Sequence, residues 1–240
     1  MVLHFDKTLT SSVDARKRLV ISKHFSYLKG KTHFDDYELK CMLLLYDKLS
    51  PKKVMRKADF FQALRVMVGV TEEPILERLY CSLELPSMHG IMFDQWVSLL
   101  SLYSRGTLDE KIVFTFMVFD TMGTGHMTRS TVEELVSNQL GKQYGNVSDE
   151  QNRFYINMVF STLDEDGDGI ISWEDYRNTI SKHPPLINCL GRVIPEQNIM
   201  DVFLTTFSRN VGPKYTLMYM KGMVRKPGTR SFITGKSKAN

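Results

Sequence analysis

One twelve-residue stretch, residues 164 to 175, most constrains what this chain can fold into. Acidic side chains stand at its first, third and fifth positions, glycine at the sixth, an aliphatic residue at the eighth and a carboxylate at the twelfth. Alternate residues of a tightly curled loop direct their oxygens at one centre, and Ca²⁺ takes about six to eight oxygen ligands. An ordinary acidic turn on the surface does not require glycine at the sixth position or an aliphatic residue at the eighth. The stretch therefore predicts a metal-binding loop.

This spacing is that of an EF-hand loop. The predicted ligands are carboxylates, a main-chain carbonyl at the seventh position and a hydroxyl that acts directly or through water: Asp164, Asp166, Asp168, Ile170, Ser172 and Asp175. A glutamate at the twelfth position normally binds with both oxygens, and Asp175 is one methylene shorter. We expect one Ca²⁺ site, weaker than a site with glutamate and relatively more tolerant of Mg²⁺.

Related loops have lost their ligands. Residues 118 to 135 keep the frame of such a loop, with Asp120, Gly125 and Met127 at the first, sixth and eighth positions. Its third, fifth and twelfth positions are Met122, Thr124 and Thr131. The stretches 83–96 and 46–61 keep still fewer of the residues expected in such a loop. Because one carboxylate cannot offset the dehydration of a divalent ion, we expect no metal in these three loops.

Apolar residues at helical spacing between the loops predict an all-α fold. We expect two lobes of paired EF-hands (helix-loop-helix), followed by a C-terminal helix and an extended basic tail. Thr107 with Glu110 forms a predicted capping box that opens the second lobe. The expected boundaries are an N-terminal arm at 1–30, lobes at 31–104 and 105–190, a helix at 191–209 and the tail at 210–240.

Two features suggest partner binding, and each has a structural alternative. The amphipathic segment 194–209 either binds a partner or folds back into the groove of its own lobe. The chain has 14 methionines, and those on apolar helix faces either line a groove for a partner helix or fill the core. The methionines on such faces are Met42, Met67, Met92, Met117, Met127 and Met158.

The formal charge of +4 conceals an uneven distribution. No acidic residue follows Asp201, whereas eight basic residues do, so the rest of the chain carries −4. Basic residues interleaved with aromatics suit an acidic polymer, which leaves nucleic acid, an anionic membrane or a microtubule surface, unless the tail only aids solubility. The predicted contact residues are Arg209, Lys214, Lys221, Arg225, Lys226 and Arg230.

Several function classes are disfavoured by the sequence. We expect no membrane span, no signal peptide and no myristoyl anchor, because long apolar runs and a glycine at position 2 are missing. The three cysteines lack a paired spacing, which favours the reducing interior of a cell. The histidines are scattered and no nucleophile or phosphate-binding motif occurs, so we expect a protein that is not an enzyme.

Longer stretches resemble a known family. "SLLSLYSRGTLDEKIVFTFMVFD" (98–120) and "KTHFDDYELKCMLLLYDKL" (31–49) are similar to segments of the calaxins, EF-hand proteins of cilia and flagella within the neuronal-calcium-sensor-like group. Trp96 after the second loop and the pair Asp175-Tyr176 match as well. The similarity runs from about residue 31 to about residue 207. Calaxins carry acidic ligands where this chain has Pro86, Met88, Met122 and Thr124, so a switch with three calcium sites is not implied.

The resemblance implies a place in the cytoplasm and cytoskeleton, on the axoneme of a cilium or sperm flagellum. The implied partners are the proteins of the outer dynein arm docking complex, dynein and tubulin, with no nucleic acid and no membrane anchor. A chain with three silent loops would keep the attachment and lose much of the calcium switch. The alternative is a soluble calcium-sensor or calcineurin-B-like regulatory subunit of a phosphatase, kinase or channel.

Overall fold

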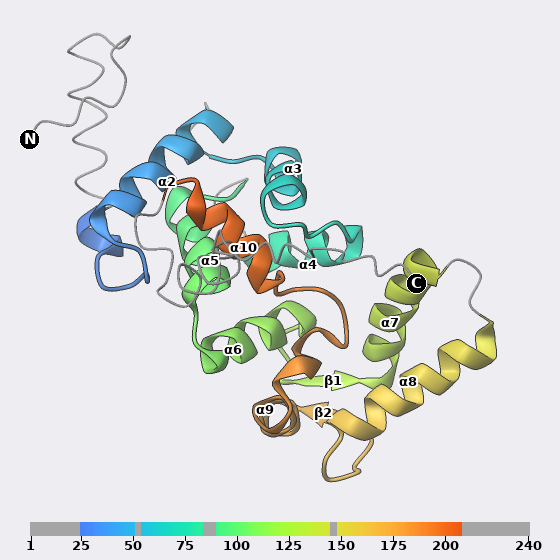
Figure 1. The fold of residues 1–240 in the computed structure, drawn as a ribbon. Helices are drawn as coiled ribbons and strands as arrows, with labels where there is room; N and C mark the ends of the chain where they lie inside the picture. The colour runs from blue at the N-terminus through green and yellow to red at the C-terminus, as the bar shows by residue number, and fades with distance from the viewer. Residues whose placement is uncertain (1–24, 51–53, 84–89, 145–147, 208–240) are drawn as a thin grey trace, which may run out of the picture.

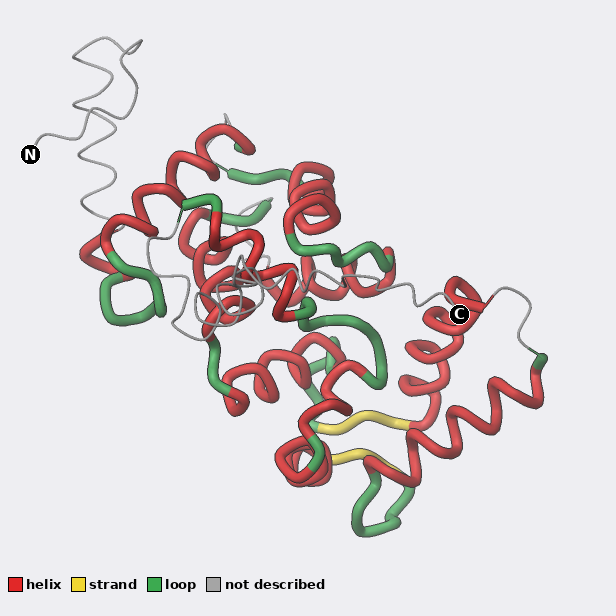
Figure 2. Tube along the Cα trace, viewed as in Figure 1, coloured by secondary structure: helices red, strands yellow, loops and turns green. Residues whose placement is uncertain are grey.

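The computed structural model describes residues 25–50, 54–83, 90–144 and 148–207. Within these ranges the chain consists of helices, connecting segments, two short strands and one isolated bridge (Figures 1 and 2). The prediction of an all-α fold is therefore confirmed. Residues 1–24 of the predicted N-terminal arm and the tail from residue 208 lie outside the described residues.

The helices follow the order of four hands. In the described residues, the first lobe contains α2 (Asp36–Leu49), α3 (Lys57–Met67), α4 (Glu73–Leu83) and α5 (Phe93–Arg105). The second lobe contains α6 (Leu108–Phe119), β1 (His126–Thr128), α7 (Arg129–Tyr144), α8 (Asp149–Leu163), β2 (Ile170–Ser172) and α9 (Trp173–Lys182). The chain continues through the 3₁₀ helix η1 (Pro184–Asn188) to α10 (Gln197–Thr205).

Capping boxes explain where α2, α6, α8 and α9 begin. In each, the side chain before the helix accepts the third amide, and the third side chain accepts the amide of the cap residue. At α6, the Thr107 amide donates to Glu110 Oε2 at 2.7 Å, and the Glu110 amide donates to Thr107 Oγ1 at 3.2 Å. Such caps contribute about 1 kcal/mol each. The predicted capping box of Thr107 and Glu110 is confirmed.

The loops of the first lobe are joined by main-chain bonds and buried side chains. Met55 and Ile91 exchange two amide-to-carbonyl hydrogen bonds of 2.9 Å, and both side chains are fully buried. The Tyr46 hydroxyl also donates to the Ile91 carbonyl at 2.7 Å. Beneath them, the rings of Phe60 and Trp96 meet edge-on with centroids 6.1 Å apart. This lobe thus keeps the loop pairing of EF-hands although its loops lack the acidic ligands.

The loops of the second lobe pair through β1 and β2, which lie side by side in Figure 2. The pairing is antiparallel and places Met127 opposite Ile171, with both side chains fully buried. The aliphatic residue at the eighth position of the predicted metal loop, Ile171, thus lies in a short strand paired with the neighbouring loop. Below the strands, the Phe116 ring contacts the rings of Trp173 and Tyr176, with centroids 5.2 and 5.5 Å away. Aromatic residues of the core therefore contact the C-terminal end of the predicted metal loop.

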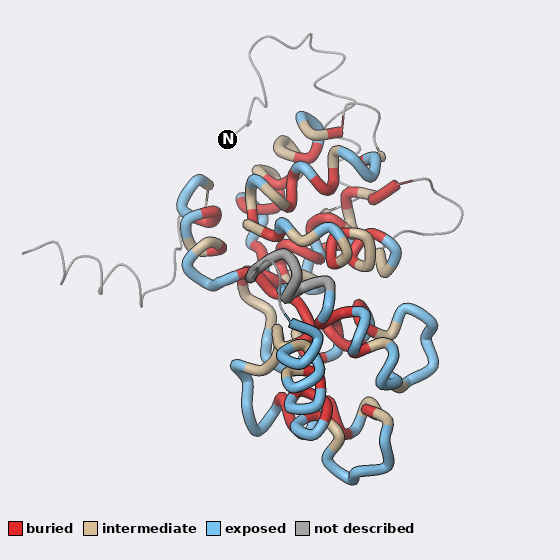
Figure 3. The backbone as a smooth tube through the Cα atoms, turned by 90° about the vertical axis from the view of Figure 1, so that its right-hand side faces the viewer, coloured by how far each residue is buried: buried red, intermediate tan, exposed pale blue. Residues whose placement is uncertain are grey.

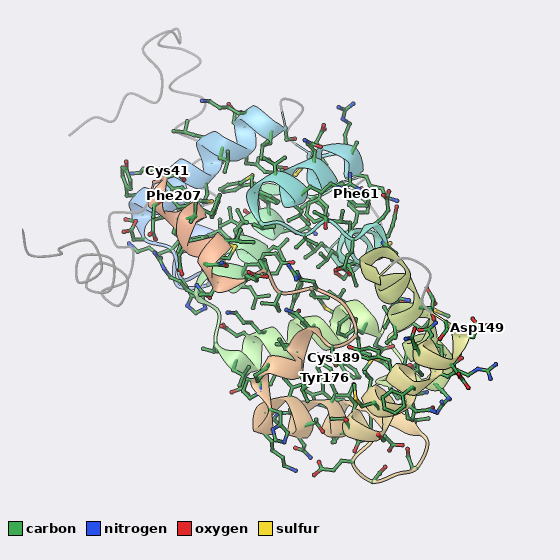
Figure 4. The ribbon with its side chains drawn as sticks, turned by 45° about the vertical axis from the view of Figure 1, so that its right-hand side comes forward. Cys41, Phe61, Asp149, Tyr176, Cys189 and Phe207 are labelled. Atoms are coloured by element: carbon green, nitrogen blue, oxygen red, sulfur yellow. The ribbon has the colours of Figure 1, made fainter. Side chains whose placement is uncertain are left out.

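Helix α10 packs against α5 of the first lobe. The Gln197 side-chain amide donates to the Ser104 carbonyl at 3.3 Å. A Cβ added at Gly69 would lie 3.0 Å from Ile199 Cδ1, so the glycine permits this close approach. The C-terminal end of α10 points toward α2, and Phe207 lies on the same side of the molecule as Cys41 (Figures 1 and 4).

The alternative that the C-terminal helix folds into the groove of its own lobe is therefore wrong. The reason lies in the segment after η1, which crosses α4: a Cβ added at Gly191 would lie 2.5 Å from Ile75 Cδ1. This crossing carries the chain over to the first lobe, where Met200 and Leu204 become buried. The helix spans Gln197–Thr205 and is therefore shorter than the predicted helix 191–209 and than the amphipathic segment 194–209.

Ion pairs join elements near the boundary of the lobes. At the end of α5, Arg105 donates to both carboxylate oxygens of Glu38 at 2.6 and 2.7 Å, and to the His33 carbonyl at 2.9 Å. The Glu38 side chain is only 1% exposed. From α4, Arg78 donates to the Phe119 carbonyl at 3.0 Å and to Glu134 at 3.1 Å. Arg78 thus connects the first lobe to the helices on both sides of loop 120–131.

The methionines divide between the two alternatives. Met42 and Met127 are fully buried and fill the core. Met117 on α6 and Met158 on α8 are 43% and 46% exposed. The second lobe therefore has methionines at its surface, while α10 packs against α5 of the first lobe.

Candidate metal centre

The predicted metal loop begins where α8 ends. The Asp164 amide still donates to the Phe160 carbonyl at 2.9 Å, while the Asp164 carboxylate turns into the loop. Its Oδ1 accepts the Gly167 amide at 2.9 Å and its Oδ2 accepts the Gly169 amide at 3.1 Å. Both glycines have positive φ angles, 74° and 89°, which other residues rarely adopt. Asp164 therefore closes the loop as well as supplying oxygen atoms.

Three predicted ligands meet in this loop. One carboxylate oxygen from each of Asp164, Asp166 and Asp168 lies within 4.8 Å of the other two. Asp166 accepts the Asp168 amide at 3.1 Å, and Asp168 accepts the Ile170 amide at 2.9 Å. The loop is mostly exposed, as Figure 3 shows for both loops of this lobe. Unit charges 4 Å apart repel by about 1 kcal/mol in water, so a cation is favoured here.

Ile170 and Ser172 lie on β2, opposite Thr128 and His126 of β1. This places the predicted carbonyl ligand and the predicted hydroxyl ligand on a strand whose position is set by the neighbouring loop. The donor set consists of carboxylate, carbonyl and hydroxyl oxygens. These are the ligands that Ca²⁺ and Mg²⁺ prefer, so the residues present fit either ion.

Asp175 does not belong to the converging group of carboxylates. Its side chain is buried, and its Oδ2 accepts the Ser172 amide at 3.0 Å and the Ser172 hydroxyl at 2.6 Å. The Ser172 hydroxyl in turn accepts the Asp175 amide at 3.1 Å, which closes the capping box of α9. One oxygen of Asp175 is thus committed to the helix cap, which favours binding through a single oxygen.

Replacing Asp175 with glutamate is expected to raise Ca²⁺ affinity about tenfold, because the longer side chain reaches the ion with both oxygens. Mg²⁺ affinity should rise less, since its octahedral shell at shorter distances does not favour a bidentate carboxylate. Calorimetric titration with each ion measures both effects. Glu174→Asp, the opposite change at the neighbouring exposed position, should leave both affinities unchanged. An Asp175→Glu variant with unaltered Ca²⁺ affinity contradicts the argument.

The neighbouring loop, 120–131, offers a different set of groups. Asp120 is its only acidic residue, and the side chain of Met122, at the third position, is 86% exposed. Burial raises the pKa of Asp120, but hydrogen bonds from the amides of Thr124 and Gly125 and from the Thr124 hydroxyl outweigh burial and hold the pKa below its usual range. The carboxylate thus stays charged, with protein donors around it.

The role of Thr124 was not predicted from the sequence, where the residue stands at a position that lacks a metal ligand. In the structure, its hydroxyl lies within hydrogen-bond distance of two oxygens of its own loop. The signal was available, because a threonine hydroxyl can donate to a carboxylate that stands four residues earlier in a tight loop.

The six predicted contact residues of the tail, Arg209 to Arg230, lie outside the described residues. Their role therefore stays a prediction. In the part of the chain that the structure describes, no helix combines the length and the apolar character needed to cross a bilayer.

Comparison with known proteins identifies relatives along most of the chain. No protein-family profile matches. Calaxins from five species are 24–29% identical over 68–82% of the chain. Calaxin of Bos taurus is 26% identical over 74% of this chain and 88% of its own length. The calcium-binding protein NCSA of Dictyostelium discoideum is 32% identical, over 45% of this chain and 58% of its own length.

A further relative is the calcineurin B protein of Naegleria gruberi, which is 26% identical over 65% of this chain and 86% of its own length. The relatives are thus calaxins and other regulatory proteins of this kind, not enzymes. The predicted resemblance is confirmed, and so is the prediction of a non-enzymatic protein.

Proposed function

We propose that this chain, a calaxin-like EF-hand protein, is a calcium-binding adaptor on the axoneme of a cilium or sperm flagellum. Its partners in this proposal are the outer dynein arm docking complex, dynein and the doublet microtubule. The observation that carries the calcium part is the convergence of Asp164, Asp166 and Asp168 in one loop. The similarity to calaxins over most of the chain supports the place on the axoneme.

Calcium binding in loop 164–175 would act on the rest of the second lobe through residues that contact this loop. The carboxylates of the loop and the oxygens of Ile170 and Ser172 would hold the ion. Calcium would supply a cross-link among these oxygens and neutralise the repulsion between the carboxylates. Trp173 follows directly and begins α9, its ring packs on Phe116, and its amide donates to the Gly125 carbonyl at 3.1 Å. Rearrangement of the loop would therefore reach α6, α9 and the neighbouring loop.

Residual calcium regulation of dynein motility would act through these contacts. With one loop rich in carboxylates and the others lacking ligands, the expected response is graded and involves one ion. Because Trp173 is only partly buried and lies within loop 164–175, its fluorescence should report binding, whereas Trp96 is fully buried in the other lobe and should change little.

The adaptor proposal is tested by co-sedimentation with doublet microtubules that carry or lack the docking complex. The proposal expects the full chain to pellet with doublets that carry the complex, and to pellet less when the complex has been extracted. Equal recovery in the supernatant with both preparations contradicts it. A parallel series with calcium and with a chelator measures how far attachment depends on the ion.

Deletion of residues 210–240 is expected to weaken microtubule co-sedimentation several-fold at low salt. The deleted segment carries seven basic residues and no acidic one, and it would face an acidic surface. The difference should shrink as salt rises, because the Debye length falls to about 8 Å at physiological ionic strength. A full-length chain in which glutamine replaces the basic residues of the tail is the second variant. It separates the effect of losing the positive charge from the effect of shortening the chain. Unchanged binding of both variants contradicts the prediction.

A second candidate is a calcineurin-B-like regulatory subunit of a phosphatase, kinase or channel. The observation in its favour is an exposed apolar pair one turn apart on α8, Phe154 and Met158, at 73% and 46% exposure. Such a pair suits the apolar face of a partner helix. Imaging of the tagged chain in ciliated cells separates the candidates, since the adaptor predicts signal along the axoneme and the soluble regulator predicts signal throughout the cell body.

A further inference from the structure

The silent loop 120–131 is closed by the same hydrogen bond as the metal loop 164–175. In the silent loop, Asp120 Oδ2 accepts the Gly125 amide at 2.7 Å. In the metal loop, Asp164 Oδ2 accepts the Gly169 amide at 3.1 Å. Each bond runs from the sixth position to the first, and both glycines have positive φ angles, 77° and 89°. The silent loop therefore keeps the curvature of a metal loop.

The Thr124 side chain adds a link that a bound ion would make in a competent loop. Its hydroxyl lies 3.1 Å from Asp120 Oδ1 and 3.0 Å from the His126 carbonyl oxygen. These oxygens belong to the first and seventh positions, where EF-hand loops supply a carboxylate and a carbonyl to the ion. The Thr124 amide also donates to Asp120 Oδ1, at 3.0 Å. Main-chain and hydroxyl donors thus surround the single carboxylate of this loop.

The silent loop is joined to the metal loop through predicted ligand positions. His126 pairs with Ser172 and Thr128 pairs with Ile170 across the β1–β2 pair. The Gly125 carbonyl also accepts the amide of Trp173 at 3.1 Å. A displacement of residues 125–128 would therefore move the carbonyl and the hydroxyl that the metal loop offers.

We propose that Asp120 and Thr124 are positioning residues for the metal site of the neighbouring loop. They hold loop 120–131 in its closed form without a metal, and through β1 they keep Ile170 and Ser172 in place for the ion. The proposal rests on the proposed calcium binding of loop 164–175. Its consequence is that the second lobe needs one ion, because side-chain hydrogen bonds replace the cross-link that a second ion would provide.

The test compares Thr124→Val, Thr124→Ser and Asp120→Ala with the unaltered chain by calcium calorimetry. If only a fraction of the protein molecules hold the metal loop in the conformation that binds calcium, the apparent calcium affinity falls in proportion to that fraction. Thr124→Val removes the hydroxyl and is expected to weaken calcium binding about fivefold, the equivalent of one hydrogen bond, whereas Thr124→Ser retains it and should bind as the unaltered chain does. Asp120→Ala removes every bond to the carboxylate and should weaken binding more than tenfold.

Met122→Ala is the matched control, because this exposed side chain lies in the same loop and has no part in its closure; its affinity should not change. Wild-type calcium affinity in both Thr124→Val and Asp120→Ala overturns the proposal. If Asp120→Ala does not fold, as judged by circular dichroism, the comparison of Thr124→Val with Thr124→Ser tests the proposal alone.

Amide exchange in the metal-free protein separates this proposal from the proposed function. The proposal expects the Ile171 amide to exchange faster in Thr124→Val than in the unaltered chain, whether or not calcium binds. Unchanged exchange overturns it. A lack of calcium binding by the unaltered chain instead contradicts the proposed function, and the exchange experiment still tests the positioning role.

Discussion

Replacing Asp164 with alanine is expected to lower calcium affinity about a hundredfold or more, the largest effect among single changes in the loop. The variant loses a charged ligand and also the two hydrogen bonds through which the carboxylate closes the loop, from the amides of Gly167 and Gly169. Calorimetry should show no heat of binding at micromolar calcium, and the fluorescence of Trp173 should not respond.

Glu174→Ala is the control for this experiment, because it removes the same charge from an exposed position of the same loop that supplies no ligand. Its affinity should stay within about twofold of the unaltered chain, since exposed charges are screened by solvent and salt. Equal losses in the two variants would mean that calcium responds only to the overall charge of this surface, which contradicts a defined site.

Replacing Arg105 with methionine is expected to lower the free energy of unfolding by about 3 kcal/mol, because it removes the positive charge that pairs with the buried carboxylate of Glu38. For a chain of this size the melting temperature should fall by about 9 °C. Thermal and denaturant unfolding, followed by circular dichroism, measure both quantities. The double variant Glu38→Gln with Arg105→Met should recover most of the loss, since glutamine is neutral and still accepts the Asp35 amide.

Arg192→Met provides the comparison for an exposed ion pair. Arg192 and Glu196 are 45% and 55% exposed, so their contact should contribute less than about 1 kcal/mol. A loss at Arg105 no greater than the loss at Arg192 would show that the contact with Glu38 does not hold α2 to α5.

The helices and the loop pairing could be predicted from the sequence because local signals determine them. Thr107 and Glu110 specify the start of α6 within four residues of chain, and the aliphatic eighth position of each loop in the second lobe becomes a strand partner. The three aspartates at alternate positions likewise meet because loop curvature brings them together. Each of these features depends on neighbours that are close in the sequence.

The position of α10 could not be predicted in the same way. Its amphipathic pattern shows that one face needs an apolar partner, but both lobes offer one, and periodicity does not distinguish between them. The choice depends on long-range contacts, such as Gly191 against Ile75 and Ile199 against Gly69. The ion pair of buried Glu38 with partly exposed Arg105, 67 residues apart, was missed for the same reason. Asp175 caps α9 through hydrogen bonds with Ser172, three residues earlier. This role could not be predicted before the first residue of the helix was known.

The proposed function assigns one calcium ion to this chain, in loop 164–175, with the neighbouring loop closed by its own side chains. Calorimetric titration of the purified full chain with calcium, in the presence of magnesium and with Trp173 fluorescence followed in parallel, measures the number of ions bound and their affinity. We expect one ion per chain, a micromolar dissociation constant and a fluorescence change that Asp164→Ala abolishes. Absence of binding, or two or more ions per chain, would contradict this assignment.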